Sequence, residues 1–171
     1  MVLGMTLPTY TLLHVLISLV GIGSGLVVLS GLLTDRRLDR WTAIFLATTV
    51  AASLSGFGFP VDHVMPSHIV GSISLVALAF AIAARYKFQM VRAWRWIYVV
   101  GAIMALYLNC FVLVVQSFLK IPALSALAPT QTEPPFAVAQ LIVLAVFIGL
   151  GVAGVKKFQK KPASSAMAAA A

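Results

Sequence analysis

The chain is poor in charged residues and nearly lacks cysteine. Only 9% of its 171 residues are charged and 61% are hydrophobic, whereas soluble domains average about 25% charged and about 45–50% apolar residues. A soluble globule of this size cannot hide so much apolar surface, so the composition predicts a protein whose solvent is lipid. The single cysteine, Cys110, cannot form an intramolecular disulfide, and its place within an apolar run indicates a small buried residue.

The sequence also lacks the arrangements that carry enzyme chemistry. It holds only four acidic residues, and it shows no nucleophile beside a base, no phosphate-binding loop and no paired carboxylates. The length fits one membrane domain with no room for a soluble catalytic domain beside it. We therefore do not expect a self-contained enzyme.

Five apolar runs are long enough to cross a bilayer, which needs about 20 residues. Backbone polar groups find no water in lipid, so each run is expected to be a helix. The sequence thus predicts an all-α bundle of five transmembrane helices within residues 1–158 and a disordered cytoplasmic tail at 159–171. The expected spans are 7–33, 41–59, 67–84, 96–119 and 136–155.

The net charge of +8 has a topological explanation. The basic residues form short clusters between apolar runs and are not interleaved with stacking aromatics, which argues against nucleic acid as a partner. With five spans, every basic residue except Lys120 falls on one side of the membrane. The positive-inside rule then places the N-terminus outside and the C-terminus inside, in a bacterial inner membrane. Trp41, Trp94 and Trp96 would lie near the inner interface.

The polar residues within the spans gather towards the outer side. His14 lies in the first span, the segment FGFPVDHVMPSH carries His63 and His68, and Gln140 lies one turn into the last span. Asn109, Gln116 and Lys120 follow one another at spacings that share one helix face. Because exposure of such a face to lipid would cost several kcal/mol, we expect it to face the bundle. A second stripe, with His14, Ser18, Gly21 and Gly25, could face it from the first span.

Several interpretations of this polar set remain open. His14 and His68 could bracket a haem b, or a metal ion could bind His14, His63 and His68, with Asp62 as a further ligand. A quinone-type pocket would use the donors and acceptors of the spans: His14, His68, Tyr107, Asn109, Gln116 and Gln140. The simpler alternatives are that the loop histidines are solvated and that the amides only join helices.

The first half of the chain resembles small bacterial polytopic membrane proteins. The shared pattern has a histidine opening the first span, small residues along it, an arginine-rich inner loop and another histidine opening a later span. His14, Arg36, Arg37, Arg40 and His68 match this layout. The resemblance implies a multi-pass membrane protein and no particular activity.

Together these observations predict a non-enzymatic membrane subunit with an outward-facing polar pocket. A small-solute or ion transporter and a purely structural assembly factor are the alternatives. Besides the lipid bilayer, other membrane subunits or a second copy of the chain are the expected partners.

Overall fold

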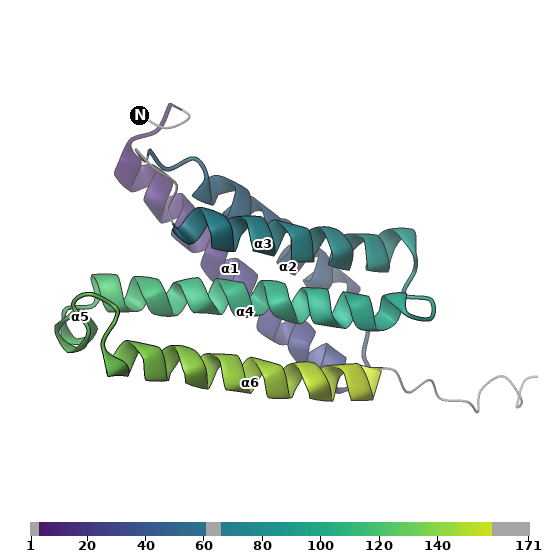
Figure 1. The fold of residues 1–171 in the computed structure, drawn as a ribbon. Helices are drawn as coiled ribbons and strands as arrows, with labels where there is room; N and C mark the ends of the chain where they lie inside the picture. Colours follow the sequence, from purple (N-terminus) through teal and green to yellow (C-terminus); the bar gives the residue numbers. More distant parts are fainter. Residues whose placement is uncertain (1–3, 61–65, 159–171) are drawn as a thin grey trace, which may run out of the picture.

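The computed structural model describes residues 4–60 and 66–158, and within these ranges its regular elements are helices and no strand forms. The all-α prediction is confirmed. The elements are α1 (Leu7–Leu33), α2 (Asp39–Gly56), α3 (Pro66–Ile82), the π-helix η1 (Ala83–Lys87), α4 (Trp94–Lys120), α5 (Pro122–Leu127) and α6 (Pro134–Phe158). Figure 1 shows them in order. The tail 159–171 lies outside the described residues.

Four of these helices are long and apolar enough to cross a membrane: Leu7–Leu33, Ser67–Lys87, Trp94–Lys120 and Pro134–Phe158. Their bounds lie close to the expected spans, and the first agrees at both ends. The helix Ser67–Lys87 is longer than the expected span 67–84, because η1 continues α3 without a break. Helix α2, which corresponds to the expected span 41–59, is the shortest of the five when η1 is counted with α3, and it includes Asp39 and Arg40 in its first turn.

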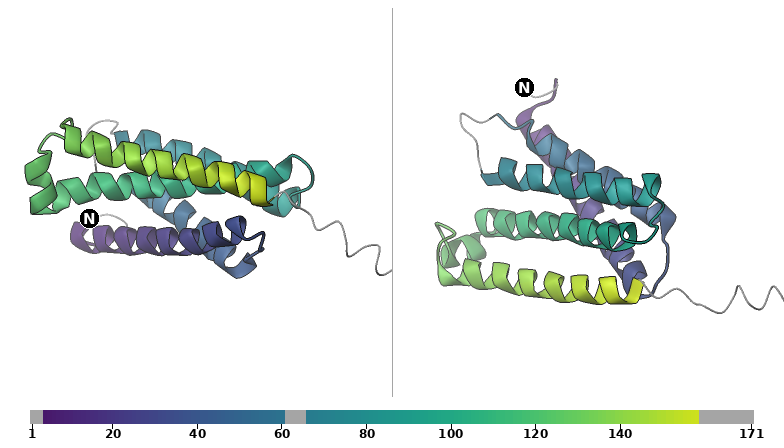
Figure 2. Two further views of the ribbon diagram at one scale, coloured as in Figure 1. Left: turned by 90° about the horizontal axis from the view of Figure 1, so that it is seen from below. Right: turned by 45° about the vertical axis from the view of Figure 1, so that its right-hand side comes forward.

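The helices form two layers. Helices α3, α4 and α6 lie side by side, and the pair α1 and α2 packs across one face of that layer at an incline (Figures 1 and 2). Helix α4 is central, because it contacts α3, α6, α1 and α2. Successive long helices run in opposite directions, so the turns between them alternate between the two ends of the bundle.

One end of the bundle, which we call the basic end, holds the α1–α2 connection, the η1–α4 connection and the end of α6 (Figure 1). The opposite end holds the start of α1, the end of α2 and helix α5. Helix α5 is not among the helices expected from the sequence. It begins at Pro122, a residue suited to the first turn of a helix.

Small residues allow the helices to approach closely. A Cβ atom on Gly25 would lie only 2.6 Å from Leu106 Cδ1 and 2.9 Å from the Phe45 ring, and one on Gly101 would lie 2.9 Å from the Ala77 carbonyl oxygen. Glycine at these positions therefore permits the α1–α2–α4 and α3–α4 contacts. Buried residues of α1 concentrate between Gly21 and Leu32, so packing is densest in the half nearest the basic end.

Candidate functional site

Three polar side-chain atoms converge on Gly21 of α1. A Cβ atom placed on this glycine would lie 3.1 Å from Asn109 Nδ2, 3.2 Å from Thr49 Oγ1 and 3.4 Å from Thr48 Oγ1. The missing side chain of Gly21 thus lets polar groups of α2 and α4 approach α1 closely. We call Gly21, Thr48, Thr49 and Asn109 the Gly21 niche.

Two of the three atoms in the Gly21 niche have no hydrogen-bond partner among the described residues. Thr49 Oγ1 and Asn109 Nδ2 are both buried and unpaired, and Thr49 is only 1% exposed. By contrast, Thr48 donates to the Ile44 carbonyl at 2.7 Å, the usual arrangement of a hydroxyl within a helix. An unpaired buried polar group costs about 1–3 kcal/mol, so a hydrogen-bond partner for either atom would stabilise the bundle.

The Gly21 niche lies at mid-depth in the bundle. Gly21, Thr49 and Asn109 each stand near the middle of their helices, α1, α2 and α4. The sequence predicted that Asn109 faces the interior of the bundle and that the α1 stripe containing Gly21 lies opposite it. The structure brings Asn109 and Gly21 together. Thr49 was not singled out, because threonine in an apolar helix normally bonds to its own backbone and carries no distinctive pattern.

His14 joins α1 to the end of α2. Its Nδ1 lies 2.8 Å from the Ser55 hydroxyl, and its ring meets the Phe59 ring edge-on with centroids 5.3 Å apart. One turn earlier, the Tyr10 hydroxyl donates to the Ser55 carbonyl oxygen at 2.7 Å. One ring nitrogen of His14 is therefore engaged within the protein, and Nε2 is the nitrogen that remains for a ligand.

His68 begins α3 near the same turn, with its ring tilted against Phe57 at a centroid distance of 5.4 Å. His14 and His68 thus pack on two different phenylalanines of one segment. Among residues 4–60 and 66–158, no three histidine, cysteine or acidic side chains are grouped so that they could hold a metal ion. His63 and Asp62, which the metal hypothesis also uses, lie outside the described residues.

Gln140 of α6 holds a third unpaired atom. Its Nε2 donates to the Phe111 carbonyl oxygen of α4 at 3.2 Å, whereas its Oε1 is buried without a donor. Tyr107 also faces α6, because its ring lies 5.8 Å from that of Phe147. These two residues therefore lie on a different side of α4 from the Gly21 niche.

Gln116 does not join any of these groups. The expectation that it faces the bundle with Asn109 is wrong, since both Gln116 and Lys120 are exposed. The helix face was identified correctly, but α1 is inclined to α4 and diverges from it towards the opposite end (Figure 1). The face that Asn109 presents to α1 is consequently uncovered two turns later.

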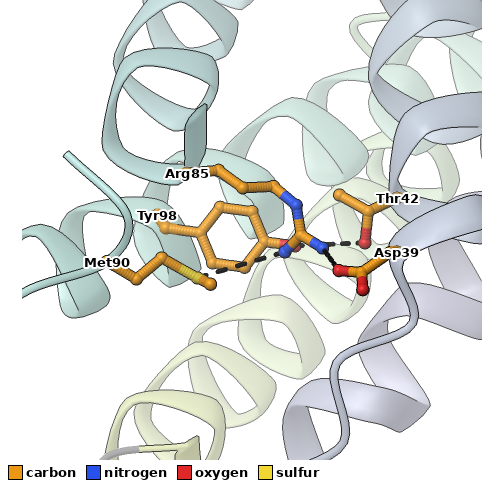
Figure 3. A network of polar contacts seen from close by, with 5 residues as sticks. All are labelled: Asp39, Thr42, Arg85, Met90 and Tyr98. Atoms are coloured by element: carbon orange, nitrogen blue, oxygen red, sulfur yellow. Dashed lines mark hydrogen bonds and ion pairs between the residues drawn. The ribbon is translucent and has the colours of Figure 1, made fainter. Parts of the chain in front are cut away.

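The structure also shows a buried charged cluster near the basic end, drawn in Figure 3. Arg85, in the π-helix η1, forms an ion pair with Asp39 at the start of α2. Its guanidinium lies 5.1 Å from the Tyr98 ring centroid, and it points towards the Met90 sulfur. Sequence reasoning assigned Arg85 only to the topology signal. The five-residue π-helix has no sequence pattern that would have indicated a buried arginine.

Comparisons with models of protein families, with curated proteins and with solved structures found no match for this chain. The interpretation of the site therefore depends on the chain's own residues and their geometry.

Proposed function

We propose that the chain is a multi-pass membrane protein with five spans, its N-terminus outside and its C-terminus inside a bacterial cytoplasmic membrane. We further propose that it is a ligand-binding or accessory subunit and not an enzyme. Four helices have the length and composition of a membrane crossing. The fifth, α2, needs a separate argument.

The surface of α2 supports its assignment as a span. Thr42 and Thr49 are each 1% exposed, so these hydroxyls face the bundle. After Arg40, the exposed residues of α2 are all apolar: Trp41, Ala43, Ile44, Ala47, Ala51 and Leu54. The low mean hydropathy of α2 thus comes from the two charged residues at its start and from hydroxyl residues that are buried or half-buried. Lipid would contact an apolar face, as in the other four helices.

The orientation is supported by the charges at the two ends. Arginine and lysine residues of the described ranges gather at the basic end, whereas Lys120 is the cation of the opposite end. The side with more lysine and arginine is normally cytoplasmic. The Gly21 niche would then lie near the middle of the bilayer.

The observation that carries the ligand proposal is the unpaired pair in the Gly21 niche. Asn109 Nδ2 is a donor, and the Thr49 hydroxyl can donate as well. The group that satisfies both is an oxygen acceptor, and the carbonyl oxygen of a quinone has this chemistry. Nδ1 of His14 is engaged by Ser55, which leaves Nε2 as the nitrogen that a metal or haem iron would use, so the haem alternative has a test of its own below.

The test uses Thr49→Val and Asn109→Leu, with Thr48→Val as the matched control because the Thr48 hydroxyl bonds to its own helix. Each protein is purified in mild detergent, and the quinone extracted by organic solvent is quantified per protein. We expect near-equimolar quinone in wild type and Thr48→Val and strong depletion in the other two. Wild-type protein that carries no quinone, or equal content in all four proteins, would refute the proposal.

A visible spectrum before and after dithionite reduction tests the haem alternative on the same samples. A Soret band with reduced α and β bands would replace the quinone by haem and make His14 and His68 the candidate axial ligands. A featureless spectrum would exclude haem b as the ligand.

The depth of the Gly21 niche favours one second candidate, a transporter of a small polar solute. Transporters commonly hold their substrates near the bilayer midplane, and Gly21, Thr49 and Asn109 lie at the middle of their helices. Solute flux into proteoliposomes that is abolished by Asn109→Leu, with the fold intact, would favour this function over a static subunit.

A further inference from the structure

The basic end of the bundle presents an unbalanced set of exposed cations. Three lie on the α1–α2 connection and the start of α2 (Arg36, Arg37, Arg40), two lie at the end of η1 and just before α4 (Lys87, Arg92), and two lie in the last turn of α6 (Lys156, Lys157). The acidic residues of this end are Asp35 and Asp39. Most of its positive charge therefore has no compensating carboxylate nearby.

The two cations that the fold does use are different ones. Arg85 is buried and forms the ion pair with Asp39, which is the one ion pair among the described residues. Arg95 donates to the carbonyl oxygen of Phe158 at 3.4 Å and lies over its ring, so it caps the end of α6. Among the seven exposed cations, Lys87 lies 5.6 Å from the Phe88 ring centroid, and the other six make no side-chain contact of this kind within the described residues. These cations are available to a negatively charged partner.

Large aromatic side chains accompany these cations. Trp41 and Trp96 are 46% and 45% exposed, and Tyr86 is 52% exposed. All three stand at the basic end of α2, η1 and α4. Tryptophan and tyrosine with this exposure are typical of the headgroup level of a membrane, where one edge of the ring is apolar and the other is hydrated.

The arrangement distinguishes a lipid surface from a single macromolecular partner. The cations lie on the α1–α2 connection, on the η1–α4 connection and in the last turn of α6, which are three separate segments at one end of the bundle (Figure 1). A leaflet that surrounds the bundle meets all three at once, and it places an anionic headgroup beside each.

We propose that the basic end binds phospholipids with a net negative headgroup, of the phosphatidylglycerol type, in preference to zwitterionic ones. This inference rests on the proposed membrane topology. Arg36, Arg37 and Arg40, which flank Trp41, form the densest of the three groups and are the principal contacts. Each cation near such a surface contributes measurably to the attraction, and the attraction weakens with salt.

The tryptophans provide a direct measurement, because all three of the chain, Trp41, Trp94 and Trp96, lie at or beside the basic end. The full chain is reconstituted into phosphatidylcholine vesicles that contain equal fractions of either dibrominated phosphatidylglycerol or dibrominated phosphatidylcholine. Bromine on the acyl chain quenches a neighbouring tryptophan. We expect the anionic lipid to quench more strongly at low salt, with an apparent preference of about twofold or more.

The test variant replaces Arg36, Arg37 and Arg40 by glutamine, and the matched control is Lys120→Gln at the opposite end. The preference should fall towards one in the triple variant and at high salt, and it should persist in the control. Equal quenching by both lipids in the wild type would overturn the lipid inference while leaving the topology standing. No quenching by either lipid would show that the tryptophans are not in the bilayer and would overturn the topology itself. A preference that survives the triple variant would also overturn the assignment to the α1–α2 connection.

Discussion

The ion pair between Arg85 and Asp39 leads to the sharpest prediction about stability. Arg85 has a side-chain exposure of 5%, whereas that of Asp39 is 80%. The guanidinium is thus desolvated by the protein, but its counter-ion remains in contact with water. Removal of Asp39 would leave a buried charge whose remaining partners are the Met90 sulfur and the Tyr98 and Tyr86 rings (Figure 3).

The expected cost follows from this asymmetry. Loss of one partner of a fully buried pair costs about 3–5 kcal/mol. Because water screens Asp39, the cost of Asp39→Ala should be smaller, about 1–3 kcal/mol in the free energy of unfolding. In an Arg85→Met background there is no buried charge to leave unpaired, so the same substitution should cost less than about 0.5 kcal/mol.

The assay is a double-mutant cycle on the purified protein in detergent, with unfolding followed by the loss of helical circular dichroism. The four proteins are wild type, the two single variants and the double variant. Asp35→Asn is the matched control, since Asp35 is an exposed acid of the same connection without an ion pair among the described residues, and asparagine tolerates its φ of 53°. If Asp39→Ala costs the same in both backgrounds, Asp39 does not stabilise the fold through Arg85 and the reasoning fails.

Three further predictions can be tested by stability measurements. Gly25→Ala should lose about 1–3 kcal/mol, because the new methyl group would overlap Leu106 and Phe45, whereas Gly23→Ala, which meets nothing within 4 Å, should be neutral or stabilising; equal effects would contradict the close packing of α1. Desolvation is the largest single influence on the pKa of Glu133 and raises it, but hydrogen bonds from its own backbone and from Thr130 and Thr132 together outweigh it and lower the pKa below the usual 4.5. The stabilisation of the α5–α6 connection should therefore be present above about pH 4.5 and be lost as pH falls through the lowered pKa; amide exchange there should show no such acid dependence in Glu133→Gln, and a persistent dependence would assign it to another group. Gln116→Leu should change stability by less than about 0.5 kcal/mol because Gln116 is exposed, and a larger loss would indicate that another chain covers this face.

Much of the helical architecture could be predicted from the sequence. The bounds of the apolar runs follow the helices within a few residues, since hydropathy is a local property and lipid offers the backbone no alternative to helix. Helix α5 was missed, because a segment of six residues is too short to show a periodic pattern. The continuation of α3 into η1 was missed for a related reason. A π-helix is defined by its hydrogen bonds and not by a residue pattern.

The candidate site was only partly predictable. Spacing along α4 placed Asn109, Gln116 and Lys120 on one face, and this placement needed no tertiary information. Whether a neighbouring helix covers that face depends on the angle at which α1 crosses α4. The structure shows that Asn109 is covered and that Gln116 and Lys120 are exposed. The role of Thr49 also depends on the tertiary structure, because it follows from the position of Gly21 of α1 opposite its hydroxyl.

The sequence by itself determined the apolar character of this protein, its helices and the uneven charge of its two ends, because composition and hydropathy act locally along the chain. Only the tertiary structure decided which polar atoms meet. Gly21, Thr49 and Asn109 belong to three different helices. Asp39, Arg85 and Tyr98, which meet in the charged cluster, also belong to three different helices. Such contacts depend on crossing angles and on the close approach of particular small residues, which no single segment encodes.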